Sequence, residues 1–92
     1  MNLRWSSAAL SDLIEIRQFV APENPTAAER LAGRLVAAAQ QLEALPSIGR
    51  PGRVAGTREL IVEPYIVAYR LVENGLEVLR VLHGARRWPV RF

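Results

Sequence analysis

The chain has 92 residues, half of them apolar, with no cysteine, one histidine, twelve arginines and a net charge of +3. The lack of cysteine excludes a disulfide framework and a thiolate zinc site, and one histidine is too few for a histidine-based metal site. It has no run of about 18 apolar residues and no signal-peptide pattern at its start. We therefore expect a cytoplasmic protein that is not inserted in a membrane and needs no metal or cofactor.

A chain of this size is expected to fold as one domain over residues 1–92, near the lower end of what buries a core unaided. Its apolar content is high for so small a protein, so some apolar residues must face outward. We expect a partner protein to cover part of this apolar surface. The positive charge permits an acidic or nucleic-acid partner without indicating which.

The first half of the chain predicts a strand followed by a helix. Polar and apolar residues alternate over Asn2–Trp5, which is typical of a short strand. A helix over 8–20 follows, because four apolar residues keep the spacing of one helical face: Ala9, Leu13, Ile16 and Val20. Ser6 or Ser7 provides its N-cap, and Pro22 ends it near the preceding residue.

A second helix is predicted after the turn PENPT. Thr26 and Glu29 have the spacing of a capping box, and apolar residues keep helical phase as far as Leu45, before Pro46. The short connection makes the two helices an antiparallel hairpin. The next segment, PSIGRPGRVAG, lacks a phosphate-binding motif and is expected to be a mobile connector.

Three strands are predicted from Thr57 onward: TRELIVE, YIVAYRLV and LEVLRVLH, separated by Glu63-Pro64 and Asn74-Gly75. If each strand pairs with the next one along the chain, the sheet has the order 1-2-3-4 and every pair is antiparallel. The expected fold class is α+β: a short N-terminal strand, a helix hairpin and a three-stranded antiparallel meander, with the helices packed on one face of the sheet.

The register of the last hairpin decides where two arginines point. A two-residue Asn74-Gly75 loop sends Arg70 and Arg80 to opposite faces, whereas a three-residue loop places them on the same face. We favour the three-residue loop, because it also gathers one apolar face: Val67, Tyr69, Leu71, Leu79 and Val81.

The C-terminal stretch HGARRWP holds the only histidine. His83 could act as the base or acid of metal-independent RNA cleavage, with arginines stabilising the phosphorane charge: Arg58, Arg70, Arg80, Arg86 or Arg87. A single histidine at a strand end is more often a structural hydrogen-bonding residue. Trp88 either folds back over the sheet or forms a cationic, aromatic contact patch with Arg86 and Arg87.

Five stretches follow one another in a recognisable order: W then AALSDLIEI, NPTAAERL, LPSIGRPGR, GTRELIVEPYIVAYRL and LEVLRVLHGARRWP. Over nearly the whole chain this order resembles the RelE/ParE superfamily, the toxins of bacterial type II toxin–antitoxin systems. The fold that the resemblance implies is the one predicted above from periodicity.

The superfamily divides by target. RelE-like members cleave messenger RNA in the ribosomal A site, with two lysines before a shared tyrosine and an arginine directly after it. With Tyr65 as that tyrosine, the lysine positions hold Thr57 and Glu59, and the arginine position holds Ile66. A glutamate repels phosphate, and an isoleucine cannot stabilise a phosphorane. The chain looks more like the ParE branch, some members of which poison DNA gyrase without being enzymes.

The ParE-like resemblance implies a growth-inhibiting toxin with a role in plasmid stabilization, which contacts DNA gyrase through Arg86, Arg87 and Trp88. Some nuclease members use a histidine near the last strand. The alternative is therefore a ribosome-dependent mRNA endonuclease with the site residues His83, Arg58, Arg70 and Arg80. Direct nucleic-acid binding stays open.

The resemblance also implies a small cognate antitoxin, ParD-like or of another family, with a disordered arm that folds on the toxin. Such an arm suits an apolar groove rimmed by arginine. Leu10, Leu13 and Ile14 are expected to line this groove.

Overall fold

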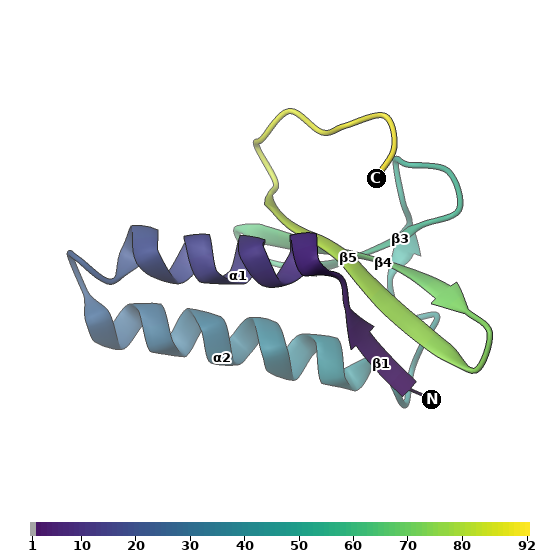
Figure 1. Ribbon diagram of the computed structural model, residues 1–92, viewed down its shortest axis with the longest axis horizontal. Helices are drawn as coiled ribbons and strands as arrows, with labels where there is room; N and C mark the ends of the chain where they lie inside the picture. The colour runs from purple at the N-terminus through teal and green to yellow at the C-terminus, as the bar shows by residue number, and fades with distance from the viewer. Residues whose placement is uncertain (1) are drawn as a thin grey trace.

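The computed structural model describes residues 2–92 and contains two helices and a five-stranded sheet (Figure 1). In chain order the elements are β1 (Asn2–Trp5), α1 (Ser7–Val20), α2 (Pro25–Gln41), β2 (Arg50–Pro51), β3 (Arg58–Val62), β4 (Tyr65–Val72) and β5 (Gly75–His83). The α+β class is confirmed. Within residues 2–92, no helix is both long and apolar enough to cross a membrane.

The sheet order is β1-β5-β4-β3-β2, and the prediction of an all-antiparallel 1-2-3-4 sheet is wrong. β1 lies parallel to β5, from Asn2 opposite Gly75 to Trp5 opposite Val78, whereas the other pairs are antiparallel. A Cβ added to Gly75 would lie 2.2 Å from the carbonyl oxygen of Asn2, so this close pairing needs a glycine. A four-residue strand carries no signal for the edge of the sheet that it joins.

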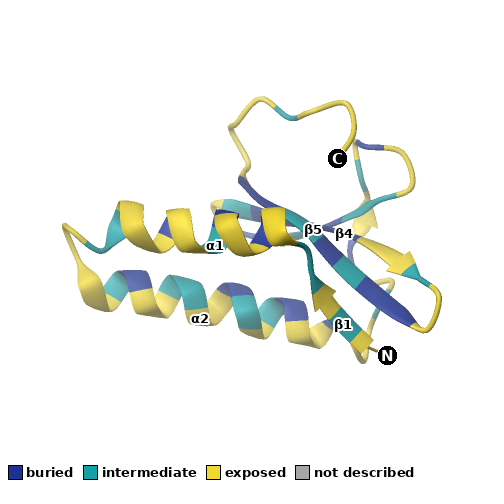
Figure 2. Cartoon of the chain, in the orientation of Figure 1, coloured by how far each residue is buried: buried dark blue, intermediate teal, exposed yellow. Residues whose placement is uncertain are grey.

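The two helices cover one face of the sheet, and the main core lies between them and the strands (Figures 1 and 2). Its buried residues are Ala9, Ile16, Leu35, Ala39, Val62, Val67, Val78 and Val81. A second buried cluster, Leu42, Tyr69 and Leu76, lies beyond the end of α2. The helix faces predicted from apolar spacing are therefore the faces that pack on the sheet.

The predicted N-cap is confirmed for α1 and wrong for α2. Ser6 caps α1 by accepting from the amide of Ala9 at 3.0 Å. The predicted capping box of α2 is wrong, because Asn24 is the N-cap and its Oδ1 accepts from the Ala27 amide at 3.0 Å. Pro25 then occupies the first helical turn, which its fixed φ angle suits. The helix also ends at Gln41 rather than Leu45, since Leu42 turns into the second cluster.

The hairpin between β4 and β5 has a register that neither expected loop produces. Its turn is Glu73-Asn74, with Asn74 at φ 64°, and Arg70 lies opposite Glu77. A β-bulge between Ala68 and Tyr69 then places Ala68 opposite Arg80. The extra residue of the bulge, Leu79, shifts the register so that Arg80 lies on the same face of the sheet as Arg70, the arrangement that we favoured. The bulge removes Leu79 from the pairing, and Leu76 and Val78 complete the buried apolar face with Val67, Tyr69 and Val81.

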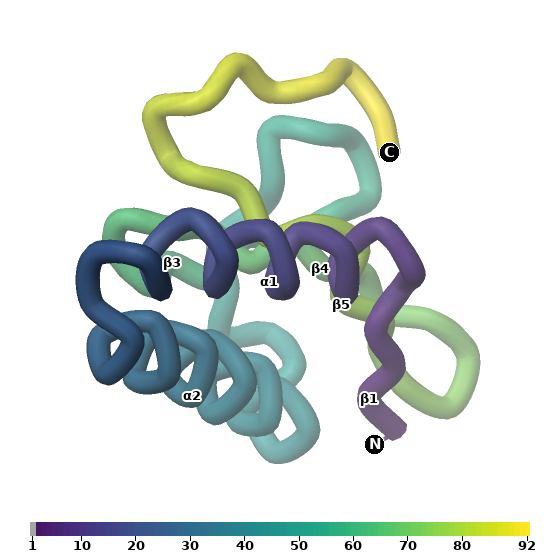
Figure 3. Tube along the Cα trace, turned by 60° about the vertical axis from the view of Figure 1, so that its left-hand side comes forward, coloured from purple at the N-terminus to yellow at the C-terminus, as the bar shows by residue number. Residues whose placement is uncertain are grey.

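The segment 46–56, predicted as a connector, is held to the sheet by strand pairing and hydrogen bonds. It contributes β2 to the sheet edge, and the hydroxyl of Tyr69 donates to the Pro46 carbonyl at 2.8 Å. The same hydroxyl accepts from the Gly49 amide at 3.0 Å. A Cβ at Gly49 would lie 2.7 Å from this hydroxyl oxygen, so the close approach needs a glycine. Residues 52–57 and the C-terminal tail lie on the side of the sheet away from the helices (Figures 1 and 3). We call this side the second face.

Candidate functional site

The C-terminal tail, residues 84–92, crosses the second face after β5 ends. Its start is held by two backbone bonds, from Gly84 to the Pro64 carbonyl at 2.9 Å and from Arg86 to the His83 carbonyl at 3.0 Å. The side chains of Arg86 and Arg87 are exposed, and within residues 2–92 neither forms an ion pair. They border a cavity of about 320 Å³ lined by Arg80, Leu82, Arg86, Arg87, Trp88 and Pro89.

Trp88 packs within the molecule and is only partly exposed. The guanidinium carbon of Arg53 lies 4.1 Å from the centre of the indole, and the ring of Phe92 lies 6.2 Å away. The indole Nε1 is buried and has no hydrogen-bond partner among the described residues. The structure thus brings Arg86, Arg87 and Trp88 together, with the two arginines outward and the indole turned back.

Glu59 is a buried anion on the second face, with 2% of its surface exposed. Its carboxylate accepts from the Arg50 guanidinium at 3.0 Å and from the backbone amide of Arg53 at 2.8 Å. Although burial raises the pKa of Glu59, the bonds from Arg53 and Arg50 outweigh burial and lower that pKa below its ordinary value. Glu59 therefore stays ionised and fixes the 50–53 turn.

A second buried carboxylate, Asp12, joins α1 to β5. It accepts from Arg80 at 2.7 and 2.9 Å and from the backbone amide of Val81 at 2.9 Å. The hydrogen bond from Arg80 to Asp12 raises the pKa of Arg80. β1 is too short to pair with β5 beyond Val78. There Asp12 and Ser6 cover the strand edge instead, and the Ser6 hydroxyl donates to the Leu79 carbonyl at 2.8 Å. We missed this role, although Asp12 follows Ala9 by three residues and so lies in the apolar stripe of the helix.

The four residues of the alternative nuclease site do not all meet: Arg58 and Arg70 border one cavity of about 210 Å³, whereas Arg80 and His83 border two others. Arg58 donates to the Gly49 carbonyl at 2.6 Å, Arg70 pairs with Glu77 at 2.9 Å, and Arg80 pairs with Asp12. The register puts Arg58 and His83 on the helix-covered side, opposite Tyr69 and Tyr65, and Arg70 and Arg80 on the second face.

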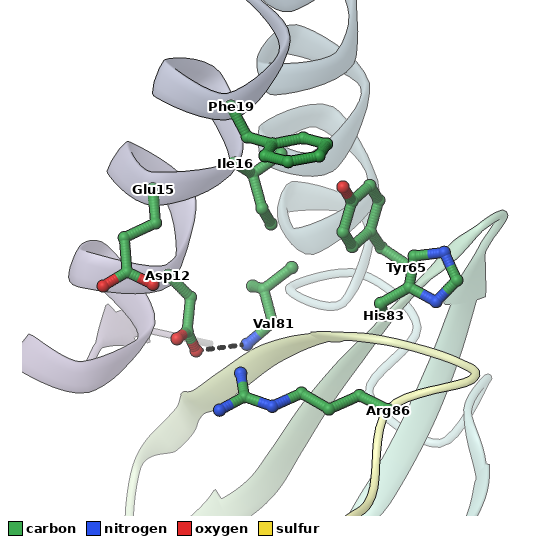
Figure 4. A pocket seen from close by; sticks show the side chains of 8 residues that line it. All are labelled: Asp12, Glu15, Ile16, Phe19, Tyr65, Val81, His83 and Arg86. Atoms are coloured by element: carbon green, nitrogen blue, oxygen red, sulfur yellow. Dashed lines mark hydrogen bonds between the residues drawn. The ribbon is translucent and has the colours of Figure 1, made fainter.

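His83 instead borders a separate cavity of about 230 Å³ between α1 and the strands (Figure 4). Its Nδ1 accepts from the Ala85 amide at 3.1 Å, and its ring meets that of Tyr65 edge to face at 5.5 Å. The residues lining this cavity are Asp12, Glu15, Ile16, Phe19, Tyr65, Val81, His83 and Arg86.

The three residues expected to line a groove on α1 differ in exposure. Leu10 is 48% exposed and Ile14 is 54% exposed, whereas Leu13 is half-buried and packs against the core. Phe19, further along the helix, is 82% exposed. As regards metals, residues 2–92 contain no group of three or more histidine or acidic side chains arranged to hold an ion.

Comparison with known proteins gives consistent results. Residues 3–88 match the family model described as the ParE toxin of the type II toxin–antitoxin system parDE. The chain is 39% identical over 90 residues to Y4kP of Sinorhizobium fredii, whose name marks it as a candidate toxin, covering 96% of this chain and 93% of Y4kP. It is 34% identical over 82 residues to toxin RelE2 of Caulobacter vibrioides, covering 89% and 93% of the two chains.

A solved structure described as the chromosomal ParDE TA system from P. aeruginosa resembles this protein, with a TM-score of 0.76 and 26% sequence identity. The match covers 90% of this chain and 95% of that chain.

Proposed function

The chain belongs to the ParE toxin family of type II toxin–antitoxin systems, and on this basis we propose that it inhibits growth by poisoning DNA gyrase, without being an enzyme itself. A small cognate antitoxin neutralises it. The observation that supports the proposal is Glu59 on the second face of the sheet, a buried anion at a position where the resemblance to RelE-like nucleases leads us to expect a lysine.

Three positions on or beside this face support a non-enzymatic role. Glu59 aligns with a position that is lysine in RelE-like nucleases. Its carboxylate is buried and pairs with Arg50 and Arg53. Ile66, at the arginine position, is 5% exposed and belongs to the core. The hydroxyl of Thr57, at the other lysine position, donates to the Val54 carbonyl at 2.6 Å. None of the three side chains can stabilise a phosphorane.

The proposed target contact is the exposed pair Arg86 and Arg87. Two guanidinium groups that form no ion pair with any described residue, beside an aromatic ring and a cavity, form the kind of surface that anchors a protein interface. Trp88 supports this surface from within the molecule, because its ring is stacked on Arg53.

The antitoxin contact that we propose lies on α1. Leu10 and Ile14 follow one another at helical spacing on its outer side and are about half exposed. An amphipathic segment of the antitoxin that folds on binding would bury them. The solved ParDE system that resembles this chain is a toxin–antitoxin system, which supports such a partner.

A second candidate function rests on the His83 cavity. A histidine, a tyrosine and an arginine border the same space there, and these residue types provide acid–base chemistry and a cation. An mRNA endonuclease would use His83, Tyr65 and Arg86, and the relative named RelE2 carries the name of the nuclease branch.

Induction of the protein without its antitoxin tests the two candidates. Gyrase poisoning produces cleaved plasmid DNA and an SOS response, whereas a nuclease produces immediate translation arrest with cuts in A-site mRNA. We expect the first outcome, with toxicity weakened by Arg86→Ala plus Arg87→Ala and little changed by His83→Gln. If His83→Gln abolished toxicity in a protein that still bound antitoxin, the nuclease would replace our proposal.

A further inference from the structure

The tail is attached to the second face at a point beyond the two exposed arginines. Arg86 and Arg87 directly precede Trp88, whose indole lies under the Arg53 guanidinium with 4.1 Å between the guanidinium carbon and the ring centre. A cation over an indole face attracts it electrostatically. Since the buried Nε1 of Trp88 has no acceptor among the described residues, stacking and packing hold the ring, not a hydrogen bond.

Arg53 is in turn held by Glu59. Oε2 of Glu59 accepts from the Arg53 backbone amide at 2.8 Å and lies 3.2 Å from its Nε. Oε1 of the same carboxylate pairs with Arg50 at 3.0 Å. The two arginines thus share one buried anion, but the structure records a ring contact with Trp88 for Arg53 alone. We call Glu59, Arg53 and Trp88 the brace.

Two anchors therefore enclose the exposed arginine pair. The backbone bonds of Gly84 and Arg86 hold the tail where it leaves β5, and the brace holds it at Trp88. A segment fixed at both ends loses less conformational freedom on binding than a free tail. Charged guanidinium groups held in this way suit carboxylates on a protein surface.

We infer that Glu59 and Arg53 are positioning residues for target contact: through Trp88 they preorganise Arg86 and Arg87 for an acidic protein surface. This inference rests on the proposed function in so far as the arginine pair is the target contact. Neither Glu59 nor Arg53 touches the target itself.

The test compares the two arginines that share Glu59. Arg53→Met removes the cation over Trp88 and keeps the apolar length of the side chain, Arg53→Lys keeps a cation, and Arg50→Met is the matched control. The first readout is the indole ¹H–¹⁵N resonance of Trp88, assigned with Trp88→Phe. The second is the protein level that halves growth on induction, and the third is inhibition of purified gyrase.

We expect Arg53→Met to move the Trp88 resonance toward its unfolded position and to raise the inhibitory level about fivefold. Arg53→Lys and Arg50→Met should stay within about twofold of the unmodified protein, and all variants should bind antitoxin normally.

Each contrary result has a separate meaning. An unchanged Trp88 resonance in Arg53→Met, or an equal change in Arg50→Met, overturns the brace. A displaced Trp88 with undiminished growth inhibition overturns the positioning role. A chain that arrests growth but leaves gyrase active refutes the proposed target, while the first two readouts still decide whether the brace exists and whether toxicity depends on it.

Discussion

Asp12 and Glu59 are both buried carboxylates that accept a backbone amide and pair with arginine, yet they hold together different parts of the molecule. Asp12 bonds Arg80 and Val81, which lie 68 and 69 residues away in the sequence, and so connects the first helix to the last strand. Glu59 bonds Arg50 and Arg53, nine and six residues away, and so shapes a turn. The first carboxylate maintains the fold, and the second maintains a surface.

The difference follows from where each anion lies. Asp12 covers the edge of β5 beyond the reach of β1, where an unpaired amide would otherwise be buried. Glu59 lies on the second face, where it supports the turn that contacts Trp88. Changes at Asp12 should therefore alter global stability, whereas changes at Glu59 should alter the tail more than the fold.

The largest effect is expected from Asp12→Ala. It leaves the Val81 amide and the Arg80 guanidinium without their acceptor, so we expect the free energy of unfolding to fall by about 3 kcal/mol. Asp12→Asn keeps an acceptor for the amide and should lose less. Urea denaturation measures both, and equal losses in the two variants would show that the amide bond contributes nothing.

A smaller loss is expected from Glu59→Gln. The isosteric amide keeps one acceptor but loses its charge-assisted bonds to Arg50 and Arg53, so unfolding should become easier by about 1.5 kcal/mol. The indole resonance of Trp88 should shift in this variant and not in Asp12→Asn. A shift of the same size in both would remove the distinction between fold and surface.

The pH dependence should separate the two carboxylates further. Because the folded state lowers the pKa of Glu59 below 4.5, its stabilisation is complete above that pH and is lost as the pH falls through the lowered pKa. In Glu59→Gln the free energy of unfolding should therefore fall less steeply as the pH is lowered. Thermal melting at several pH values measures this dependence. If the loss of stability at acid pH were the same in Glu59→Gln as in the unmodified protein, this assignment would be wrong.

The smallest effect is expected from Arg70→Gln. Arg70 pairs with Glu77 at 2.9 Å, but its side chain is 52% exposed, so the pair should contribute about 0.5 kcal/mol or less. Added salt should reduce even this contribution. A loss near that of Glu59→Gln in the same urea series would mean that burial is not what distinguishes these ion pairs.

Much of the local structure was predictable because neighbouring residues decide it. The Ser6 cap, the end of α1 near Ala21 and the side on which Arg58 lies all follow from spacing within one element. The start of α2 was equally local, but Asn24 followed by Pro25 prevailed over the capping box, because proline suits the first turn.

The candidate site was less predictable. The arginine pair and Trp88 were identified from the C-terminal stretch HGARRWP, but which of them face outward and which packs inward was not. That Trp88 turns inward depends on Arg53, 35 positions earlier in the chain. Likewise, the bulge opposite Ala68 and Tyr69 places Arg70 and Arg80 on the same face of the sheet. No turn motif in the sequence indicates this register.

By itself the sequence determined the two helices and the four longer strands, the buried helix faces, the absence of cysteine chemistry and the resemblance to a toxin superfamily, because these depend on residue types and short spacings. Only the tertiary structure decided that β1 lies parallel to β5, that Asp12 covers the exposed strand edge, and that Glu59 supports the tail through Arg53. Such pairings join residues distant in the chain, and the whole fold selects among partners that look equivalent in the sequence.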